Sequence, residues 1–304
     1  MTDRERLSLL RTMSCGTDAV VRHTEQSLPE IYDPVEVVRL GKLHSFRMEA
    51  IEQYNVMEQV AIAALLAGDT VTAHDYIQQL ASKHPASSLR LQRLQGMLLE
   101  AQGMVDDATA LYSNGLERDE ANIQLWKRLI STSISNGRRD DAIAALIVFL
   151  DRFMQDVEGW MQLAKLYYLE CKFQQSIYCL EEVLVLRPMH PLYLVRYADV
   201  VASLGRWNTA VKYYCGALEL FQDHIRALYG LRTVTALLLR RNLPSAKPKA
   251  TLDADEIDGT ILLQLHRLAG ERLTTLYQAK GQSGAKVFAV VKSWLNQHSL
   301  KPSN

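Results

Sequence analysis

Small residues recur at intervals of about 34 positions along more than half of this 304-residue chain, and this period constrains the fold more than any other feature. One column consists of Gly68, Gly103, Gly137, Cys171 and Gly205. Five residues after each member comes another small residue, which gives a second column of Ala73, Ala108, Ala142, Ser176 and Ala210. Columns that keep one register indicate a stack of similar units, each of which packs against its neighbours.

The order of large and small residues within one period predicts two antiparallel helices. The clearest copy runs from 157 to 190, with Trp160 and Ala164 in the first helix and Ser176 in the second. Small residues at the eighth and twentieth positions let the two helices approach closely, while large residues fill the remaining space. We expect the glycine column to supply a left-handed turn between the helices. Further members of the packing columns are Gly96, Trp126 and Ala198.

This pattern resembles the tetratricopeptide repeat. The resemblance implies an all-α fold, a right-handed α-α superhelix of about five repeats with helical caps. The repeats are expected at residues 54–88, 89–122, 123–156, 157–190 and 191–224. We expect three parts: an N-terminal segment with a capping helix (1–53), the repeat solenoid (54–242), and an exposed loop with C-terminal capping helices (243–304).

Local signals place the ends of this array. Asp33 is predicted as an N-cap with Pro34 at the first helical position, and a sixth first-type helix is expected at about 225–241. An exposed loop is expected over 242–256, because this stretch holds proline, lysines and terminal acids. Two amphipathic helices should follow, joined by a turn at 281–284. Their apolar residues are Ile257, Ile261, Leu265, Leu268 and Leu276 in the first, and Val287, Val291, Trp294 and Leu295 in the second.

Composition excludes several classes of protein. Lys+Arg 34 balances Asp+Glu 34, so no surplus of positive charge favours nucleic acid. The longest stretch without a charged residue, 59–68, is about half of what a membrane span needs. The four cysteines, Cys15, Cys171, Cys179 and Cys215, lack paired spacing, which favours a reducing compartment and a role as small buried apolar residues.

Motifs of catalysis are missing from the sequence. It shows no phosphate-binding glycine loop, no nucleophile elbow, and no histidine pair or Cys-x-x-Cys that would suggest zinc. The acid pairs at 106–107 and 140–141 follow the interhelical glycine, where they suit the positive end of the second helix. We therefore expect no enzyme, no cofactor and no metal.

Candidate binding residues lie on the first helices of the repeats, which line the concave groove of such a solenoid. They form a basic stripe with one aromatic residue: Arg93, Lys127, Arg128, Lys165, Tyr168 and Arg196. This stripe is a candidate site for an acidic or carboxylate-bearing peptide segment. Ordinary solvated charge explains it equally well.

Co-chaperones with this repeat bind acidic tails through a basic residue at position 5 and an asparagine at position 9 of the first repeat. The corresponding pairs are Glu58/Ile62, Arg93/Met97, Lys127/Ser131, Met161/Lys165 and Val195/Asp199. No pair supplies the asparagine, so a soluble adaptor or co-chaperone is the alternative hypothesis rather than the first.

Several short sequence stretches, in the order in which they occur, resemble those of one family, the second subunits of the endoplasmic reticulum membrane protein complex. The stretches lie at residues 58–65, 93–101, 178–182, 190–193 and 225–231, and the resemblance covers about 54–235. It implies a scaffold without catalytic residues, peripheral on the cytoplasmic side of the endoplasmic reticulum, whose partners are the other subunits of that complex. Such a scaffold holds cytosolic parts of the membrane subunits and supports insertion of tail-anchored and multipass membrane proteins.

Overall fold

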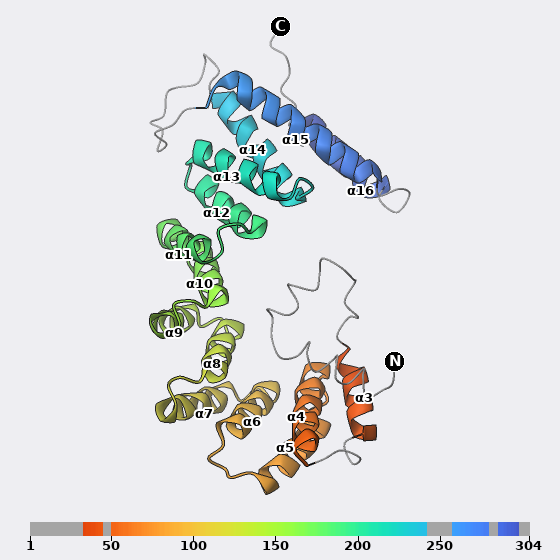
Figure 1. The fold of residues 1–304 in the computed structure, drawn as a ribbon, viewed down its shortest axis with the longest axis vertical. Coiled ribbons are helices and arrows are strands. Elements are labelled where there is room, and N and C mark those ends of the chain that lie inside the picture. The colour runs from red at the N-terminus through yellow and green to blue at the C-terminus, as the bar shows by residue number, and fades with distance from the viewer. Residues whose placement is uncertain (1–32, 45–49, 242–256, 280–284, 298–304) are drawn as a thin grey trace. The chain divides into compact units, whose positions relative to one another are not determined.

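The structure is a computed structural model that describes residues 33–44, 50–241, 257–279 and 285–297. The described residues form helices and the turns that join them (Figure 1). The chain divides into two compact units, residues 1–145 and 146–304, and each is described by itself. The all-α tetratricopeptide-repeat fold predicted from the sequence is confirmed.

The first unit is a succession of antiparallel helices, each packed on the next. Its members are α3 (Pro34–His44), α4 (Ala50–Ala67), α5 (Thr70–Lys83), α6 (Leu89–Ala101), α7 (Val105–Arg118) and α8 (Ile123–Ser135). The α9 helix (Arg139–Arg152) begins in this unit and ends in the second. The core between α4, α5 and α6 holds Met57, Ile77, Leu94 and their apolar neighbours.

The second unit continues the same pattern and then departs from it. Three helix pairs are α10 (Val157–Leu169) with α11 (Phe173–Leu186), α12 (Pro191–Ser203) with α13 (Trp207–Leu220), and α14 (Ile225–Arg241) with α15 (Gly259–Ala279). The last helix, α16 (Ala285–Gln297), packs against α15. Within this unit α15 packs on α14, and α16 follows at the C-terminal end of the described helices (Figure 1).

The predicted left-handed turns are present in all five repeats. Gly68, Gly103, Gly137 and Gly205 have φ of 73–89°, and Cys171 has φ 57°. In the fourth repeat the N–H of Lys172 donates to the carbonyl of Tyr167 at 2.9 Å, and the other repeats show the equivalent bond. This six-to-one bond closes a Schellman motif, which satisfies carbonyls at the end of the first helix and turns the chain into the second.

The second column of small residues lies in the core. All five members are fully buried: Ala73, Ala108, Ala142, Ser176 and Ala210. The hydroxyl of Ser176 donates to the carbonyl of Ala164 at 2.8 Å, so the one polar member has a partner on the facing helix. Full burial of this column is what the predicted close approach of the paired helices requires.

Helix starts follow the predicted capping signals. The Asp33 carboxylate accepts from the N–H of Val35 at 2.9 Å, and Pro34 begins α3. Both acid pairs lie in the first turns of their helices, α7 and α9, as predicted. The indole N–H groups of Trp126 and Trp160 donate to carbonyls in the preceding loops, at 2.9 and 2.8 Å, which fixes the entry of two first helices.

The C-terminal helices are found where predicted, but α15 buries a different face. Its buried residues are Leu262, His266, Ala269, Gly270 and Leu273. Ile261 and Leu268, which marked the helix in the sequence, are nearly half exposed. The difference arises because the prediction rested on large apolar residues, whereas the core face also includes His266, Ala269 and Gly270. The predicted loop 242–256, the turn 281–284 and the segment 1–32 lie outside the described residues.

The prediction that the cysteines are buried is partly wrong. Cys179 is buried and Cys215 half-buried, whereas Cys171 is exposed because it lies in the interhelical turn, with Cys15 outside the described residues. Burial raises the pKa of the Cys179 thiol to about 12 and that of Cys215 to about 11. The described thiols are free.

Candidate functional site

The six predicted binding residues lie on first helices, and the structure divides them between the two units. Arg93 on α6, with Lys127 and Arg128 on α8, belongs to the first unit. Lys165 and Tyr168 on α10, with Arg196 on α12, belong to the second. The predicted stripe is therefore two separate groups, and each has its own surroundings.

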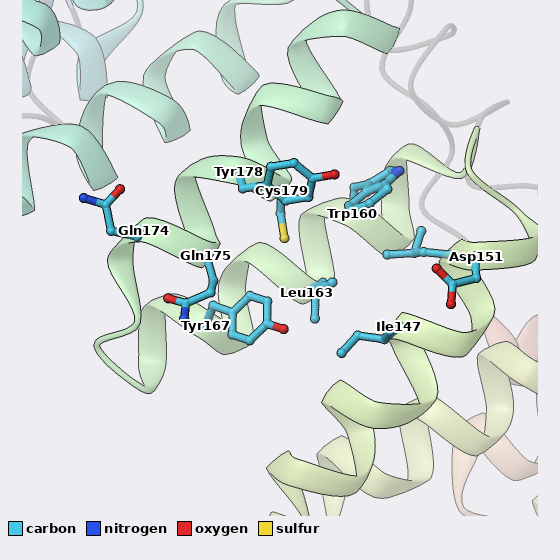
Figure 2. Close-up of a pocket in the computed structure, with 10 residues that line it drawn as sticks. Ile147, Asp151, Trp160, Leu163, Tyr167, Gln174, Gln175, Tyr178 and Cys179 are labelled. Carbon is cyan, nitrogen blue, oxygen red and sulfur yellow. The ribbon is translucent and has the colours of Figure 1, made fainter.

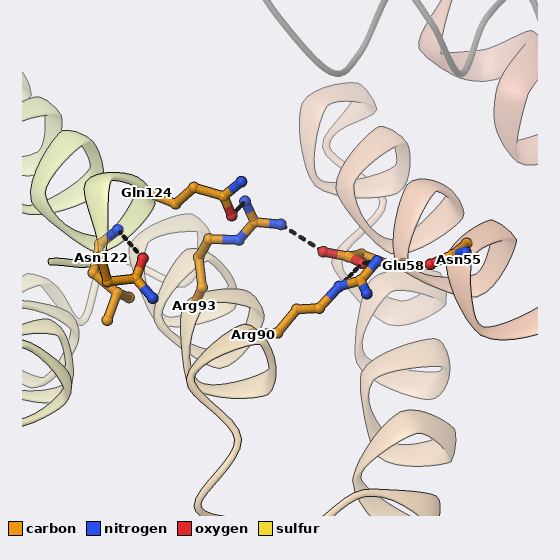
Figure 3. A network of polar contacts seen from close by, with 7 residues as sticks. Asn55, Glu58, Arg90, Arg93, Asn122 and Gln124 are labelled. Carbon is orange, nitrogen blue, oxygen red and sulfur yellow. Dashed lines mark hydrogen bonds and ion pairs between the residues drawn. The ribbon is translucent and has the colours of Figure 1, made fainter. Parts of the chain in front are cut away.

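In the first unit, Arg93 is already held by an internal carboxylate (Figure 3). Its Nη2 donates to Oε1 of Glu58 at 2.5 Å, and its Nη1 donates to Gln124. Arg90 binds the other oxygen of Glu58 and donates to Asn55 at 2.8 Å. One carboxylate on α4 thus gathers two arginines of α6, and Gln124 extends the network to α8.

The sequence suggested that Arg93 binds a carboxylate of a partner peptide. In the structure Arg93 binds the carboxylate of Glu58 within the same chain. The side chain of Arg93 is 16% exposed and that of Glu58 is 8% exposed, whereas that of Arg90 is 61% exposed. An ion pair removed from water in this way is much less screened than a surface pair. A carboxylate arriving from another protein would have to compete with Glu58 for Arg93.

Arg128 is part of a second internal cluster. It lies 3.9 Å from the Glu100 carboxylate, which also accepts a hydrogen bond from the hydroxyl of Tyr112. Burial, then the bond to Glu100, raises the pKa of the fully buried Tyr112. The ring of Tyr112 lies against Gly96, where an added Cβ would overlap it.

An equivalent cluster in the second unit was missed by the sequence analysis. The hydroxyl of Tyr214 donates to Asp199 at 2.7 Å, and Nε of Arg226 donates to the same carboxylate at 2.8 Å. The ring of Tyr214 lies against Gly230 as that of Tyr112 lies against Gly96. A signal existed, because Tyr112 and Tyr214 are three periods of 34 residues apart.

The second group of predicted residues is more open. Lys165 and Arg196 are exposed and form no ion pair with a described acidic residue. Tyr168 is 41% exposed and makes an edge contact with Phe173, with ring centroids 5.6 Å apart. These three side chains are available to a partner. Arg93 and Arg128 are available only in part, because each already has an internal acidic partner.

The second unit also holds an apolar pocket that the sequence analysis did not anticipate (Figure 2). Its volume is about 500 Å³, and it lies over α10 between α9 and α11. Trp160 and Tyr178 form one side, where their rings make an edge contact with centroids 6.2 Å apart. Ile147 and Asp151 line the side formed by α9. Tyr178 is 56% exposed, so the pocket offers an aromatic edge to an apolar side chain of a partner.

Within the described ranges, no group of three or more His, Cys, Asp or Glu side chains could hold a metal ion. In the same part of the chain, no helix combines the length and the apolar character needed to cross a bilayer.

Comparison with known proteins supports the resemblance noted in the sequence. A family profile described as the EMC2 TPR-like repeat domain matches residues 71–210. ER membrane protein complex subunit 2-A of Xenopus laevis is 33% identical over 228 residues, which cover 72% of this chain and 75% of the relative. TPR repeat protein oca3 of Schizosaccharomyces pombe is 30% identical over 219 residues, covering 68% of this chain and 76% of the relative.

Among solved structures, the C-terminal part of a TPR repeat-containing protein from Cytophaga hutchinsonii has a TM-score of 0.58. It is 15% identical and covers 83% of this chain and 93% of its own, so it supports the fold alone. The residues matched by the family profile, 71–210, lie within the predicted repeat array. The chain is a member of the family of ER membrane protein complex subunit 2, which is built on tetratricopeptide repeats.

Proposed function

We propose that this chain is a non-catalytic scaffold subunit of the endoplasmic reticulum membrane protein complex, peripheral on the cytoplasmic side. The observation that carries the proposal is the alignment with subunit 2-A of Xenopus laevis, which covers 75% of that relative. This relative is named as a subunit of the ER membrane protein complex. The partners proposed for this chain are accordingly the other subunits of that complex.

In this proposal the chain holds cytosolic segments of membrane-embedded subunits and so supports insertion of tail-anchored and multipass membrane proteins. Exposed side chains on successive first helices supply the contacts, since each repeat presents the same positions. Lys165, Tyr168 and Arg196 provide charge and an aromatic ring in the second unit. The pocket beside Trp160 and Tyr178 can receive an apolar anchor.

The alternative is a soluble adaptor that binds acidic peptide tails. It is favoured by the exposed and unpaired cations Lys165 and Arg196. It is disfavoured in the first unit, where Glu58 already binds Arg90 and Arg93. The scaffold proposal accounts for both units, since it does not require a free carboxylate clamp.

Affinity purification of the tagged chain in mild detergent, followed by mass spectrometry, tests the proposal. We expect membrane-spanning subunits to be retained in fixed stoichiometry. The double variant Lys165→Glu, Arg196→Glu should lose part of this set, whereas the matched control Lys172→Glu, Arg187→Glu, at the two capping positions of α11, should retain it. Recovery of chaperones with acidic tails, without membrane subunits, would instead establish the adaptor.

A further inference from the structure

The three C-terminal helices enclose a buried arginine without an acidic partner. Arg232 on α14 is 7% exposed. Its Nη1 donates to the carbonyl of His266 on α15 at 3.0 Å, and its Nη2 donates to the carbonyl of Leu295 on α16 at 3.2 Å. Its Nε is buried and has no hydrogen-bond partner among the described residues. A guanidinium has five N–H groups, so three remain for another acceptor.

The helices are built to admit this guanidinium. Gly270 lies within α15, and an added Cβ there would overlap Nη1 of Arg232. A glycine inside a helix costs about 1 kcal/mol relative to alanine, so the space around Arg232 is made against helix propensity. Burial lowers the pKa of Arg232, and no acidic neighbour contributes to the shift. Buried charges in proteins are usually paired, and this one lacks a carboxylate.

Arg232 contributes to the lining of a pocket of about 730 Å³ between α15 and α16. Two more cations, Arg267 and Lys292, line the same pocket, with Glu271 as its acidic residue. None of the three cations forms an ion pair with a described acidic residue. Leu263, Phe288 and Leu295 supply apolar wall.

We propose that this C-terminal pocket binds an acidic side chain of a partner polypeptide, with Arg232 as the fork that receives the carboxylate. Arg267 and Lys292 then stabilise the charge from the rim. The planar fork of arginine matches a carboxylate in two parallel hydrogen bonds. The site is distinct from the predicted stripe on the first helices, and it does not depend on which assembly the chain joins.

A peptide side chain suits this pocket better than a lipid headgroup. The guanidinium is buried at 7% exposure, so the anion has to reach inward on a flexible arm, as glutamate does. A headgroup is held at the membrane surface by its own acyl chains. The apolar wall also suits the methylene groups and neighbouring side chains of a peptide.

The test uses the full chain and NMR of arginine Nε–H groups, with the Arg232 signal identified by its loss in Arg232→Lys. A blocked nonapeptide with one central glutamate flanked by leucines is titrated, and the same peptide with glutamine is its control. We expect the Arg232 signal to shift saturably with the glutamate peptide and not with the glutamine peptide. The exposed rim variant Arg267→Gln, Lys292→Gln should weaken binding by about tenfold or more.

The matched control variant Lys172→Gln, Arg187→Gln removes the same charge from the two capping positions of α11 and should bind like the original chain. Equal shifts with both peptides, or an unchanged affinity in the rim variant, would overturn the proposal. So would displacement of the peptide by phosphatidylcholine vesicles that contain phosphatidylserine, because the pocket would then be a lipid site. Peptide binding by a chain that fails to retain membrane subunits would contradict the proposed function and leave this site established.

Discussion

The left-handed position between the two helices of a repeat is glycine in four repeats and Cys171 in the fourth of five. An L-residue with a side chain pays roughly 1–2 kcal/mol in this region, because its Cβ crowds the following carbonyl. Nothing lies within 4 Å of a Cβ added at the four glycines, so the cost is one of backbone conformation rather than space. A single dihedral angle thus sets the local stability of each turn.

Cys171→Gly should therefore stabilise the second unit, by about 0.5 kcal/mol after the greater freedom of glycine in the unfolded chain is subtracted. Urea unfolding measures the change. Cys171→Ala is the control, because it removes the thiol and keeps the strain, and it should show no gain. A gain of equal size in both variants would mean that the thiol, and not the backbone, is the cause.

The described cysteines should differ in reactivity. Raising the pKa of Cys215 from 9.0 to about 11 leaves about a hundredfold less thiolate at pH 8, and Cys179 at about 12 has less still. We expect iodoacetamide at pH 8 to label exposed Cys171 at least tenfold faster than either, as measured by peptide mass spectrometry. Comparable labelling of all three in the folded chain would contradict the packing of α11 and α13.

The raised pKa values of Cys179 and Cys215 also predict how the stability of the folded chain changes with pH. The folded-state pKa values of Cys179 and Cys215 are raised, so their contribution is complete below the unfolded value of about 9 and is lost as pH rises toward 11–12. We expect the denaturant midpoint of the chain to fall over this alkaline range. The double variant Cys179→Ala, Cys215→Ala should show a smaller fall, and an identical fall would assign the effect to the buried tyrosines.

At the scale of helices, tyrosine rings against glycines decide how closely two elements pack. Tyr112 of α7 covers Gly96 of α6, and Tyr214 of α13 covers Gly230 of α14. In each case the hydroxyl reaches an acid, so burial of the ring leaves no unpaired phenol. The contact therefore combines shape and hydrogen bonding.

Gly96→Ala should destabilise the first unit by about 1–3 kcal/mol, because overlap with the Tyr112 ring outweighs the gain in helix propensity. Gly216→Ala on α13 is the matched control: no atom lies within 4 Å of its added Cβ, and it should gain up to about 1 kcal/mol. Thermal unfolding of both variants compares the two effects. Stabilisation by Gly96→Ala would show that the ring is free to move away.

Prediction from the sequence succeeded where one residue type has one physical reason to be present. Glycines at the turns and small residues such as Ala142 and Ser176 could be placed because the period repeats them. The internal pairing of Arg93 was missed, although its partner Glu58 lies one period earlier, at the equivalent position of the preceding repeat. The core face of α15 was missed as well, since His266 and Gly270 face the core to accommodate Arg232.

At the scale of the whole molecule, two units share one repeating plan but differ in where their charges are paired. The first unit pairs Arg90, Arg93 and Arg128 internally. The second pairs Arg226 with Asp199 but leaves Lys165, Arg196 and the cations of the C-terminal pocket without an ion pair to a described acidic residue. Unpaired charge is available to a partner without the loss of an existing contact. We infer that acidic partner segments bind chiefly to the second unit.

Glu58→Gln tests the contrast between the two units. Loss of the carboxylate leaves Arg93 buried without a charge partner, so the first unit should lose about 1–3 kcal/mol of stability. The variant should also bind an acidic peptide more tightly than the original chain, as measured by calorimetry. Lower stability without any gain in binding would mean that Glu58 serves the fold alone.

Membrane fractionation tests the central claim, that this repeat array is a scaffold within a membrane protein complex, most directly. Cells that express the tagged chain are lysed, and the membranes are floated on a density gradient after a wash in high salt. We predict that the chain floats with endoplasmic reticulum membranes and is released by detergent only together with membrane-spanning subunits in constant ratio. A chain that stays in the supernatant, or that salt strips from the membranes as a monomer, would contradict the account.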